Sequence, residues 1–206
     1  MVLILLWSCR HNFIGHALVG AHQISNALAA ASVAHSLGLS AEEIAGALSL
    51  AESDAPWRME LHELPDLLLI NDAYNASPDS MAAALHTLAH LSQERGGESW
   101  AFLGNMRELG ESAALAHAEI GRLASDLGID HLVTVGAPDY RDGVGAATVL
   151  HQCADRTEAL AVADHINRGD VILCKASRSD RLELLADEIG VLWSKKVLEE
   201  NEKGVK

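Results

Sequence analysis

Residues 71–81 read NDAYNASPDSM and follow directly on the apolar run LLLI at residues 67–70. The carboxylate of Asp72 can accept two hydrogen bonds from vicinal hydroxyls, such as those of a ribose. Asn75 and Ser77 add neutral donors and acceptors close to the same position. This combination of side chains is suited to a ligand that carries hydroxyl groups.

The same segment also fits a helix-capping turn. Ser77 or Asn75 can cap a helix that Pro78 opens at its first position, and Asp79 is favourable to the helix dipole. The capping turn accounts for Asp79, but it leaves Asp72 without a reason. From the residues alone, both interpretations remain open.

Short apolar runs alternate with amphipathic stretches over most of the chain. Strands are expected at residues 57–64, 67–72, 100–104, 131–136, 147–152 and 170–175, and helices at 78–91, 111–128, 156–166 and 181–190. Such alternation predicts an α/β fold with a Rossmann-like, mostly parallel, doubly wound sheet. Ligands of this fold lie at the carboxyl ends of strands, which is where NDAYNASPDSM stands.

A polar, proline-containing break, SDAPW at residues 53–57, precedes this alternation and is typical of a hinge or linker. Before it, the spacing of apolar residues predicts helices at residues 22–38 and 41–51. Ser40 and Glu43 form a capping box for the second of these helices. The chain is therefore expected to have two parts.

The composition excludes several classes of partner. The 206 residues carry a formal net charge of -14, from 15 Lys+Arg against 29 Asp+Glu, so a nucleic-acid backbone or an anionic membrane surface is repelled. The cysteines Cys9, Cys153 and Cys174 are far apart and form no CxxC pair, which argues against a disulfide framework or a zinc site. We therefore expect a cytoplasmic protein with no nucleic-acid or membrane partner.

The first residues, MVLILLW, stand shortly before Cys9 and are similar to the end of a lipoprotein signal. The fit is poor, because no basic residues precede the run and Trp7 stands where a small residue is needed. The run is also far shorter than the roughly 20 residues of a membrane-spanning helix. A buried strand or a ragged start of the chain is the interpretation that we favour.

Five segments resemble, in order and spacing, the motifs of one enzyme family. They are AHQISNALAAASVA at residues 21–34, WRME at 57–60, NDAYNASPDSM at 71–81, LGNMRELGESAALAHAEIG at 103–121 and GDVILCKASRSDRLE at 169–183. From about residue 18 to about residue 185 the chain is similar to the Mur ligases of peptidoglycan synthesis. The AYNA signature resembles that of the branch that adds D-alanyl-D-alanine.

The resemblance implies ATP-dependent amide formation. The carboxylate of a UDP-MurNAc-tripeptide is phosphorylated by ATP, and the amine of D-Ala-D-Ala attacks the acyl phosphate. This chemistry needs a cradle for the triphosphate and Mg²⁺, a pocket for adenosine and a site that presents the amine. The implied cofactors are ATP and Mg²⁺, and the implied partners are the small molecules ATP, D-Ala-D-Ala and UDP-MurNAc-tripeptide.

The resemblance also assigns roles to individual residues. Asn26 matches a residue that contacts adenine, Arg58 a hinge arginine that reaches ribose or phosphate, and Asp72 a ribose-binding carboxylate. The segments that face the incoming dipeptide contain Asn75, Ser77, Ser177 and Arg178. The planar fork of Arg178 suits the dipeptide carboxylate. No catalytic residue and no metal ligand is implied within this chain.

Several of these residues also have a plain structural explanation. Asn26 is also explained as an amide inside a helix that bonds to a neighbouring turn. Arg58 is also explained by a surface ion pair with Glu60 or Glu63. For Lys175, which ends the run VILCK, a partly buried stem at a strand end is favoured over a catalytic role.

The sequence departs from the family pattern at four positions. Gln23 and Ser77 each stand where the family usually has Asn. Asn105 stands where Asp or Glu is usual, and Ala176 where Gly is usual. At Ala176 the side chain restricts the backbone if the residue needs a positive φ. Dipeptide binding here therefore depends on the φ angle of Ala176.

No segment matches GxxxxGK[ST], the glycine loop whose backbone amides cradle phosphates. The family's UDP-sugar domain and most of its ATPase domain are expected to precede residue 18. We therefore expect residues 1–54 to be a remnant of the central domain, residues 55–195 the C-terminal domain and residues 196–206 a charged tail. Because phosphoryl transfer depends on charge stabilisation, the chain alone is not expected to form the acyl phosphate.

Two functions from different classes remain open. In the first, the chain is an enzyme component, the C-terminal domain of the ligase, which contributes contacts to adenosine and to the dipeptide. It is then a truncated gene product, one piece of a split enzyme whose missing domains are on a second chain, or a fragment with a misassigned start. In the second, it is a catalytically dead, vestigial nucleotide-binding module. The missing phosphate loop favours the second function for the isolated chain.

The expected helices within residues 22–50 generate a testable prediction. Their apolar faces would normally pack on a central sheet, so we expect them to be exposed and the chain to self-associate or to express poorly. Size-exclusion chromatography measures the association directly. Elution as a clean, compact monomer would contradict the expectation.

Overall fold

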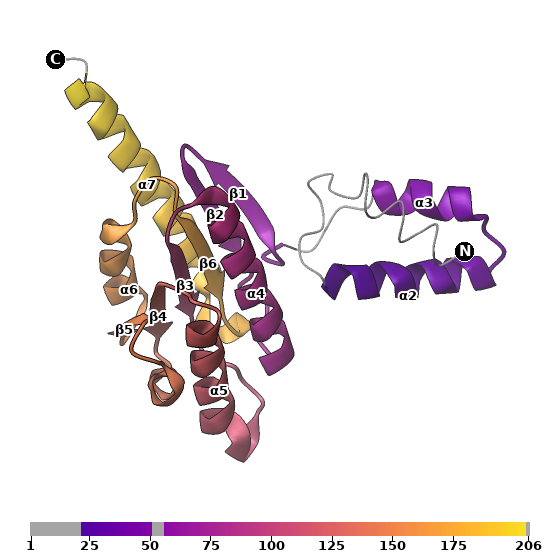
Figure 1. Cartoon of the computed structure of the whole chain (residues 1–206), viewed down its shortest axis with the longest axis horizontal. Helices are drawn as coiled ribbons and strands as arrows, with labels where there is room; N and C mark the ends of the chain where they lie inside the picture. The colour runs from indigo at the N-terminus through magenta and orange to yellow at the C-terminus, as the bar shows by residue number, and fades with distance from the viewer. Residues whose placement is uncertain (1–21, 51–55, 205–206) are drawn as a thin grey trace. The chain divides into compact units, whose positions relative to one another are not determined.

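The computed structural model describes residues 22–50 and 56–204, and its helices and strands are labelled in Figure 1. The strand favoured for the run before Cys9 lies outside the described residues. The chain divides between Pro56 and Trp57 into two compact units, and each unit is described by itself.

The first unit contains two helices, α2 (His22–Ser36) and α3 (Ala41–Ser49). The predicted capping box is confirmed. The Ser40 amide donates to Glu43 Oε2 at 2.9 Å, and the Glu43 amide donates to Ser40 Oγ at 3.3 Å. Large apolar side chains of this unit are exposed, namely those of Val33, Leu37, Leu39 and Leu50. These are the side chains that the expected self-association would use.

The second unit is built on a six-stranded sheet with the order β1-β2-β6-β3-β4-β5. The strands are β1 (Glu60–Leu64), β2 (Leu67–Asn71), β3 (Ser99–Leu103), β4 (His131–Val135), β5 (Val149–Cys153) and β6 (Val171–Lys175). All neighbouring strands are parallel except β1 and β2, which form an antiparallel hairpin. The predicted mostly parallel sheet is confirmed, with β1 as an antiparallel edge strand.

Helices cover both faces of this sheet (Figure 1). On one face, α4 (Pro78–Arg95) packs on β3, β6 and α5 (Ala113–Asp126). On the other face, α6 (Arg156–Val162) and α7 (Leu182–Gly204) pack on each other and on strands of the sheet. Alternate strand residues such as Trp100 and Phe102 share a core with Leu185 and Ile189 of α7. The sheet is therefore doubly wound, as predicted.

The last helix is longer than the sequence predicted. Expected to end at Gly190, it continues to Gly204 and includes most of the predicted charged tail. An interior glycine costs a helix only about 1 kcal/mol. Ile189, Trp193 and Val197, spaced four residues apart, bury one apolar stripe of α7 in the core, and this burial outweighs the cost. Neither α7 nor any other described helix is long and apolar enough to span a membrane.

Two glycines give a matched test of the packing. A Cβ atom at Gly97 would lie 2.1 Å from the carbonyl oxygen of Gly169, a backbone atom next to β6. We expect Gly97→Ala to lower the free energy of unfolding by about 3 kcal/mol or more, because backbone must shift. At Gly190 the nearest atom to a new Cβ is Leu64 Cδ1 at 4.0 Å. Gly190→Ala should therefore raise the free energy of unfolding by about 0.5–1 kcal/mol.

Urea denaturation followed by circular dichroism measures both changes. If Gly97→Ala were as well tolerated as Gly190→Ala, the close approach of the segments before β3 and β6 would be refuted.

Candidate functional site

Three polar segments follow the carboxyl ends of the adjacent strands β2, β6 and β3. We call this end of the sheet, together with the three segments, the carboxyl edge. Backbone hydrogen bonds join these segments beyond the strand ends. The Asp72 amide donates to the Cys174 carbonyl at 2.9 Å. The Ser177 amide donates to the Asn105 carbonyl, also at 2.9 Å. The motifs that follow three strands thus form one surface, as expected for a parallel sheet.

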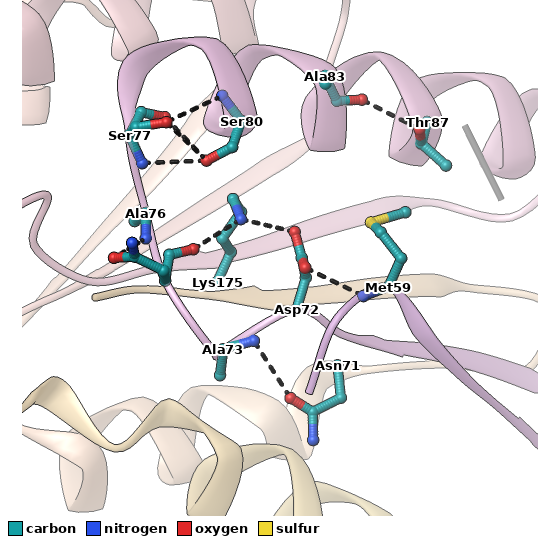
Figure 2. Close-up of polar contacts among 11 residues, drawn as sticks. Met59, Asn71, Asp72, Ala73, Ala76, Ser77, Ser80, Ala83, Thr87 and Lys175 are labelled. Carbon is teal, nitrogen blue, oxygen red and sulfur yellow. Dashed lines mark hydrogen bonds and ion pairs between the residues drawn. The ribbon is translucent and has the colours of Figure 1, made fainter. Parts of the chain in front are cut away.

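A buried ion pair connects β2 to β6 at the carboxyl edge (Figure 2). The Lys175 ammonium donates to Asp72 Oδ2 at 2.6 Å and to the Asn75 carbonyl at 2.9 Å. Lys175 is only 2% exposed and Asp72 only 8%. Burial lowers the pKa of Lys175, and attraction to Asp72 offsets only part of this effect. The strand-end stem expected for Lys175 is therefore half of an ion pair that the sequence did not predict.

Asp72 also holds the turn through which the chain enters the second unit. The Met59 amide donates to Asp72 Oδ1 at 3.0 Å (Figure 2), and the Tyr74 amide donates to the Trp57 carbonyl at 3.0 Å. Trp57 and Met59 have φ angles of 60° and 50°, a region that is strained for residues with a side chain. These two hydrogen bonds stabilise a strained turn on either side of Arg58.

Two guanidinium groups lie over aromatic rings of this turn and of the loop after β2. The Arg58 guanidinium carbon is 4.2 Å from the centroid of the Tyr74 ring, and that of Arg178 is 4.3 Å from the centroid of the Trp57 ring. Such contacts are attractive because the face of an aromatic ring is negative. In the described part of the chain, Arg58 forms no ion pair with either of the two glutamates considered for it.

The capping turn is present as well. Ser77 is the N-cap of α4: the Ser80 amide donates to Ser77 Oγ at 3.4 Å, and the Ser77 amide donates to Ser80 Oγ at 3.0 Å (Figure 2). Pro78 stands at the first helical position. Asn75 Oδ1 accepts a hydrogen bond from the next amide at 2.8 Å. Helix capping therefore explains Ser77, whereas Asp72 belongs to the ion pair.

A second polar cluster surrounds Asp180, which the sequence did not single out. Its carboxylate accepts hydrogen bonds from the Asn105 amide at 2.7 Å, from Asn105 Nδ2 at 2.8 Å and from Arg107 Nη2 at 2.7 Å. Burial raises the pKa of Asp180, but these bonds outweigh it and bring the pKa below its ordinary value. The family pattern has an acid at position 105. The side-chain Nδ2 of Asn105 is a donor to Asp180 that a carboxylate could not replace.

The loop after β6 presents Arg178 without strain at Ala176. Ala176 does not have a positive φ, so alanine in place of glycine costs nothing there. Arg178 Nη1 lies 2.7 Å from Glu183 Oε1, and the Arg178 side chain is 49% exposed. Ser177 is buried, and its Oγ accepts a hydrogen bond from the Arg107 amide at 2.9 Å. Because the Arg178 side chain is half exposed, its guanidinium keeps donors that face solvent and can bind a carboxylate.

The structure gathers most of the predicted site residues at the carboxyl edge. These are Arg58, Asp72, Asn75, Ser77, Ser177 and Arg178. Asn26 lies on α2 of the first unit and is exposed. Within the described residues, no group of three or more His, Cys, Asp or Glu side chains could hold a metal ion.

Sequence reasoning missed four residues that shape this edge: Trp57, Lys175, Asp180 and Glu183. Lys175 alone carried a local signal, because it is a charged residue that closes an otherwise apolar strand. The other three act on residues that are distant in sequence or on another element, and nothing in their own segments shows it.

Comparison with known proteins defines the class to which this fold and its carboxyl edge belong. Residues 57–178 match the family model described as Mur ligase, glutamate ligase domain. The match includes the entry turn, the loop after β2 and the start of the loop after β6, as far as Arg178. The chain belongs to the Mur ligase family.

Particular relatives narrow the comparison. The chain is 41% identical over 195 residues to UDP-N-acetylmuramoyl-tripeptide--D-alanyl-D-alanine ligase of Mycobacterium tuberculosis (strain ATCC 25618 / H37Rv). The match covers 82% of this chain and 38% of the relative. A crystal structure of MurF from Acinetobacter baumannii matches with a TM-score of 0.75 and 32% identity, over 84% of this chain and 38% of that one. The crystal structure of MurF from Thermotoga maritima in complex with ADP matches with a TM-score of 0.72 and 25% identity, over 86% of this chain and 40% of that one. The resemblance seen in the motifs is confirmed, and the chain spans less than half the length of these proteins.

The lowered pKa of Asp180 predicts a pH dependence of stability. A carboxyl group with a lower pKa in the folded chain stabilises the fold above its unfolded pKa of about 3.9, and this contribution is lost as the pH falls through the folded value. We expect the difference in unfolding free energy between the parent chain and Asp180→Asn to shrink between about pH 6 and about pH 3. Chemical denaturation at several pH values measures it, with the exposed Asp142→Asn as a control. A difference that stays constant with pH would contradict the role of Asp180.

Proposed function

We propose that this chain supplies adenosine-binding and dipeptide-binding residues to an ATP-dependent ligase that joins D-Ala-D-Ala to UDP-MurNAc-tripeptide in peptidoglycan synthesis. The Mycobacterium tuberculosis relative is named for this tripeptide and dipeptide, and the Thermotoga maritima structure is a complex with ADP. The proposed partners are these small molecules. We place the reaction in the cytoplasm, in agreement with the buried free thiols of Cys153 and Cys174.

The observation that carries the proposal is positive charge at the carboxyl edge of an acidic chain. The net charge is -14, yet Arg58 and Arg178 lie beside the turn that Asp72 holds. Arg58 and Arg178 are both exposed, so their guanidinium groups are available to anionic groups of a ligand. A nucleotide, which combines hydroxyl groups with negative charge, matches this arrangement.

The proposed nucleotide contacts follow from these positions. Asp72 accepts the ribose hydroxyls, and Arg58 contacts ribose or phosphate from the turn that Asp72 holds in place. For Asn26, on α2 of the first unit, the proposed contact with adenine rests on the motif resemblance alone. The stacking of Arg58 on Tyr74 restricts the guanidinium before a ligand binds, which reduces the entropy lost on binding.

The proposed dipeptide contacts lie on the loops after β2 and β6. Arg178 binds the dipeptide carboxylate, and its contacts with Trp57 and Glu183 fix the plane of the guanidinium. Asn75 and Ser77 add exposed neutral polar groups, and the buried Ser177 lies next to Arg178 in the chain. Of these, Ser177 Oγ accepts from a backbone amide and keeps its O–H as a donor.

ATP supplies the phosphoryl group that activates the tripeptide carboxylate. The residues of this chain bind and orient: they hold the adenosine, and they place the dipeptide so that its amine meets the acyl carbon. The sequence contains no GxxxxGK[ST] loop. We therefore propose that the phosphate cradle and the ligands of Mg²⁺ come from other domains, and that this chain alone does not form the acyl phosphate.

A vestigial nucleotide-binding module is the second candidate. Such a module would bind ADP without taking part in a reaction. When mixed with a chain that carries the missing domains, a ligase component restores ATP consumption, whereas a vestigial module does not.

Isothermal titration with ADP and with D-Ala-D-Ala tests the site. We expect Arg58→Ala to weaken ADP binding about tenfold, since a charge-assisted contact is lost, and to leave the dipeptide affinity unchanged. Arg178→Ala should do the reverse. Arg95→Ala, which removes an ion pair with Glu63 away from the site, serves as the control. The proposal fails if the parent chain binds neither ligand, or if both site variants bind them as the parent does.

A further inference from the structure

The carboxylate of Asp72 is a junction within the proposed site (Figure 2). Its Oδ1 accepts from the Met59 amide at 3.0 Å and its Oδ2 from the Lys175 ammonium at 2.6 Å. Each carboxylate oxygen can accept two hydrogen bonds, so one acceptor position remains on each. Because the Asp72 side chain is only 12% exposed, its orientation decides whether a pair of hydroxyls can use both positions.

Lys175 sets this orientation from within the sheet. Its strand, β6, is paired on both sides, with β2 and with β3. The Lys175 side chain is only 3% exposed, so the ammonium acts on a ligand through Asp72 and not directly. Its second hydrogen bond, to the Asn75 carbonyl at 2.9 Å, holds the loop that follows Asp72. One ammonium group thus fixes both the carboxylate and the loop beside it.

Lys175 also cancels the charge of Asp72. An unpaired carboxylate would repel the phosphates of a nucleotide, and this repulsion is stronger near a buried group than in water. When it is paired with an ammonium, the carboxylate still accepts hydrogen bonds from neutral hydroxyls. The ion pair therefore permits a ribose to be bound next to negatively charged phosphates.

We propose that Lys175 is a positioning residue of the nucleotide site, which aims Asp72 at the ribose hydroxyls and neutralises it so that the phosphates are not repelled. The inference rests on the proposed nucleotide-binding role of Asp72. It makes the identity of residue 175 a determinant of how strongly the site prefers ADP over adenosine, although Lys175 touches neither.

A purely structural ion pair would behave differently. Its loss would loosen the loop and weaken adenosine and ADP by the same factor, because both share the ribose. Loss of charge cancellation weakens ADP more than adenosine, because only ADP carries phosphates. The ratio of the two affinities therefore separates positioning with charge cancellation from simple structural support.

Titration calorimetry of the full chain with adenosine and with ADP at pH 7.5 measures this ratio. We expect Lys175→Met to weaken ADP about tenfold more than adenosine, and the excess to shrink at high salt. The double variant Asp72→Asn/Lys175→Met, in which both charges are removed, should return the ratio to that of the parent. Lys196→Met is the matched control, because Lys196 also donates to two carbonyls but at the opposite end of β6.

Equal weakening of both ligands by Lys175→Met, or a double variant that keeps the altered ratio, would overturn the inference while leaving the proposed function intact. If Lys175→Met does not fold, the comparison is made with the double variant and with Lys175→Arg, which keeps the charge. Lys175→Arg is expected to keep the parent ratio, and a tenfold change in it would also overturn the inference.

Absence of binding by the parent chain would instead defeat the proposed function. The positioning step is then decided by hydrogen exchange of the Met59 amide, which donates to Asp72. Lys175→Met should speed this exchange relative to amides in the middle of β6, and the double variant should slow it again. Unchanged exchange in Lys175→Met would overturn the inference without any ligand.

Discussion

The buried ion pair between Asp72 and Lys175 is the constraint on which the carboxyl edge depends. Removing one partner from such a pair costs about 3–5 kcal/mol, because the other charge is left without compensation in a poorly hydrated place. The pair joins the ends of two parallel strands, and through the Met59 amide it also holds the strained entry turn. Arg58 and the loop after β2 therefore take their positions from one contact between side chains.

The difference between what could and could not be predicted from the sequence is a difference in contact range. The capping of α4 joins Ser77 to a residue three positions away, so local spacing was enough to predict it. Lys175 and Asp72 are 103 positions apart, and only the placement of β6 beside β2 makes them neighbours. The prediction that the last helix ends at Gly190 was wrong for the same reason. Gly190 is a local stop signal, whereas the core contacts that stabilise α7 beyond it are tertiary.

The net charge of the chain and the positions of its individual cations show a similar contrast. The net charge of -14 argues against polyanionic partners such as nucleic acid, but it says nothing of how the cations are distributed. The motifs identified Arg58 and Arg178 as candidates, yet the aromatic rings beneath them became visible only in the fold. Those rings help to hold two exposed cations in place, and Arg178 is also paired with Glu183.

The direction of β1 has a topological consequence. Because β1 is antiparallel to β2, its first residue, Glu60, pairs with Asn71 at the carboxyl edge. A parallel first strand would have brought the incoming chain to the opposite edge, about 17 Å away for five residues. Reversing this single strand places the entry turn, residues 57–59, beside the loop that follows β2. The position of that turn is therefore coupled directly to Asp72 and Tyr74, whereas a parallel first strand would have left these two residues without the turn as a neighbour.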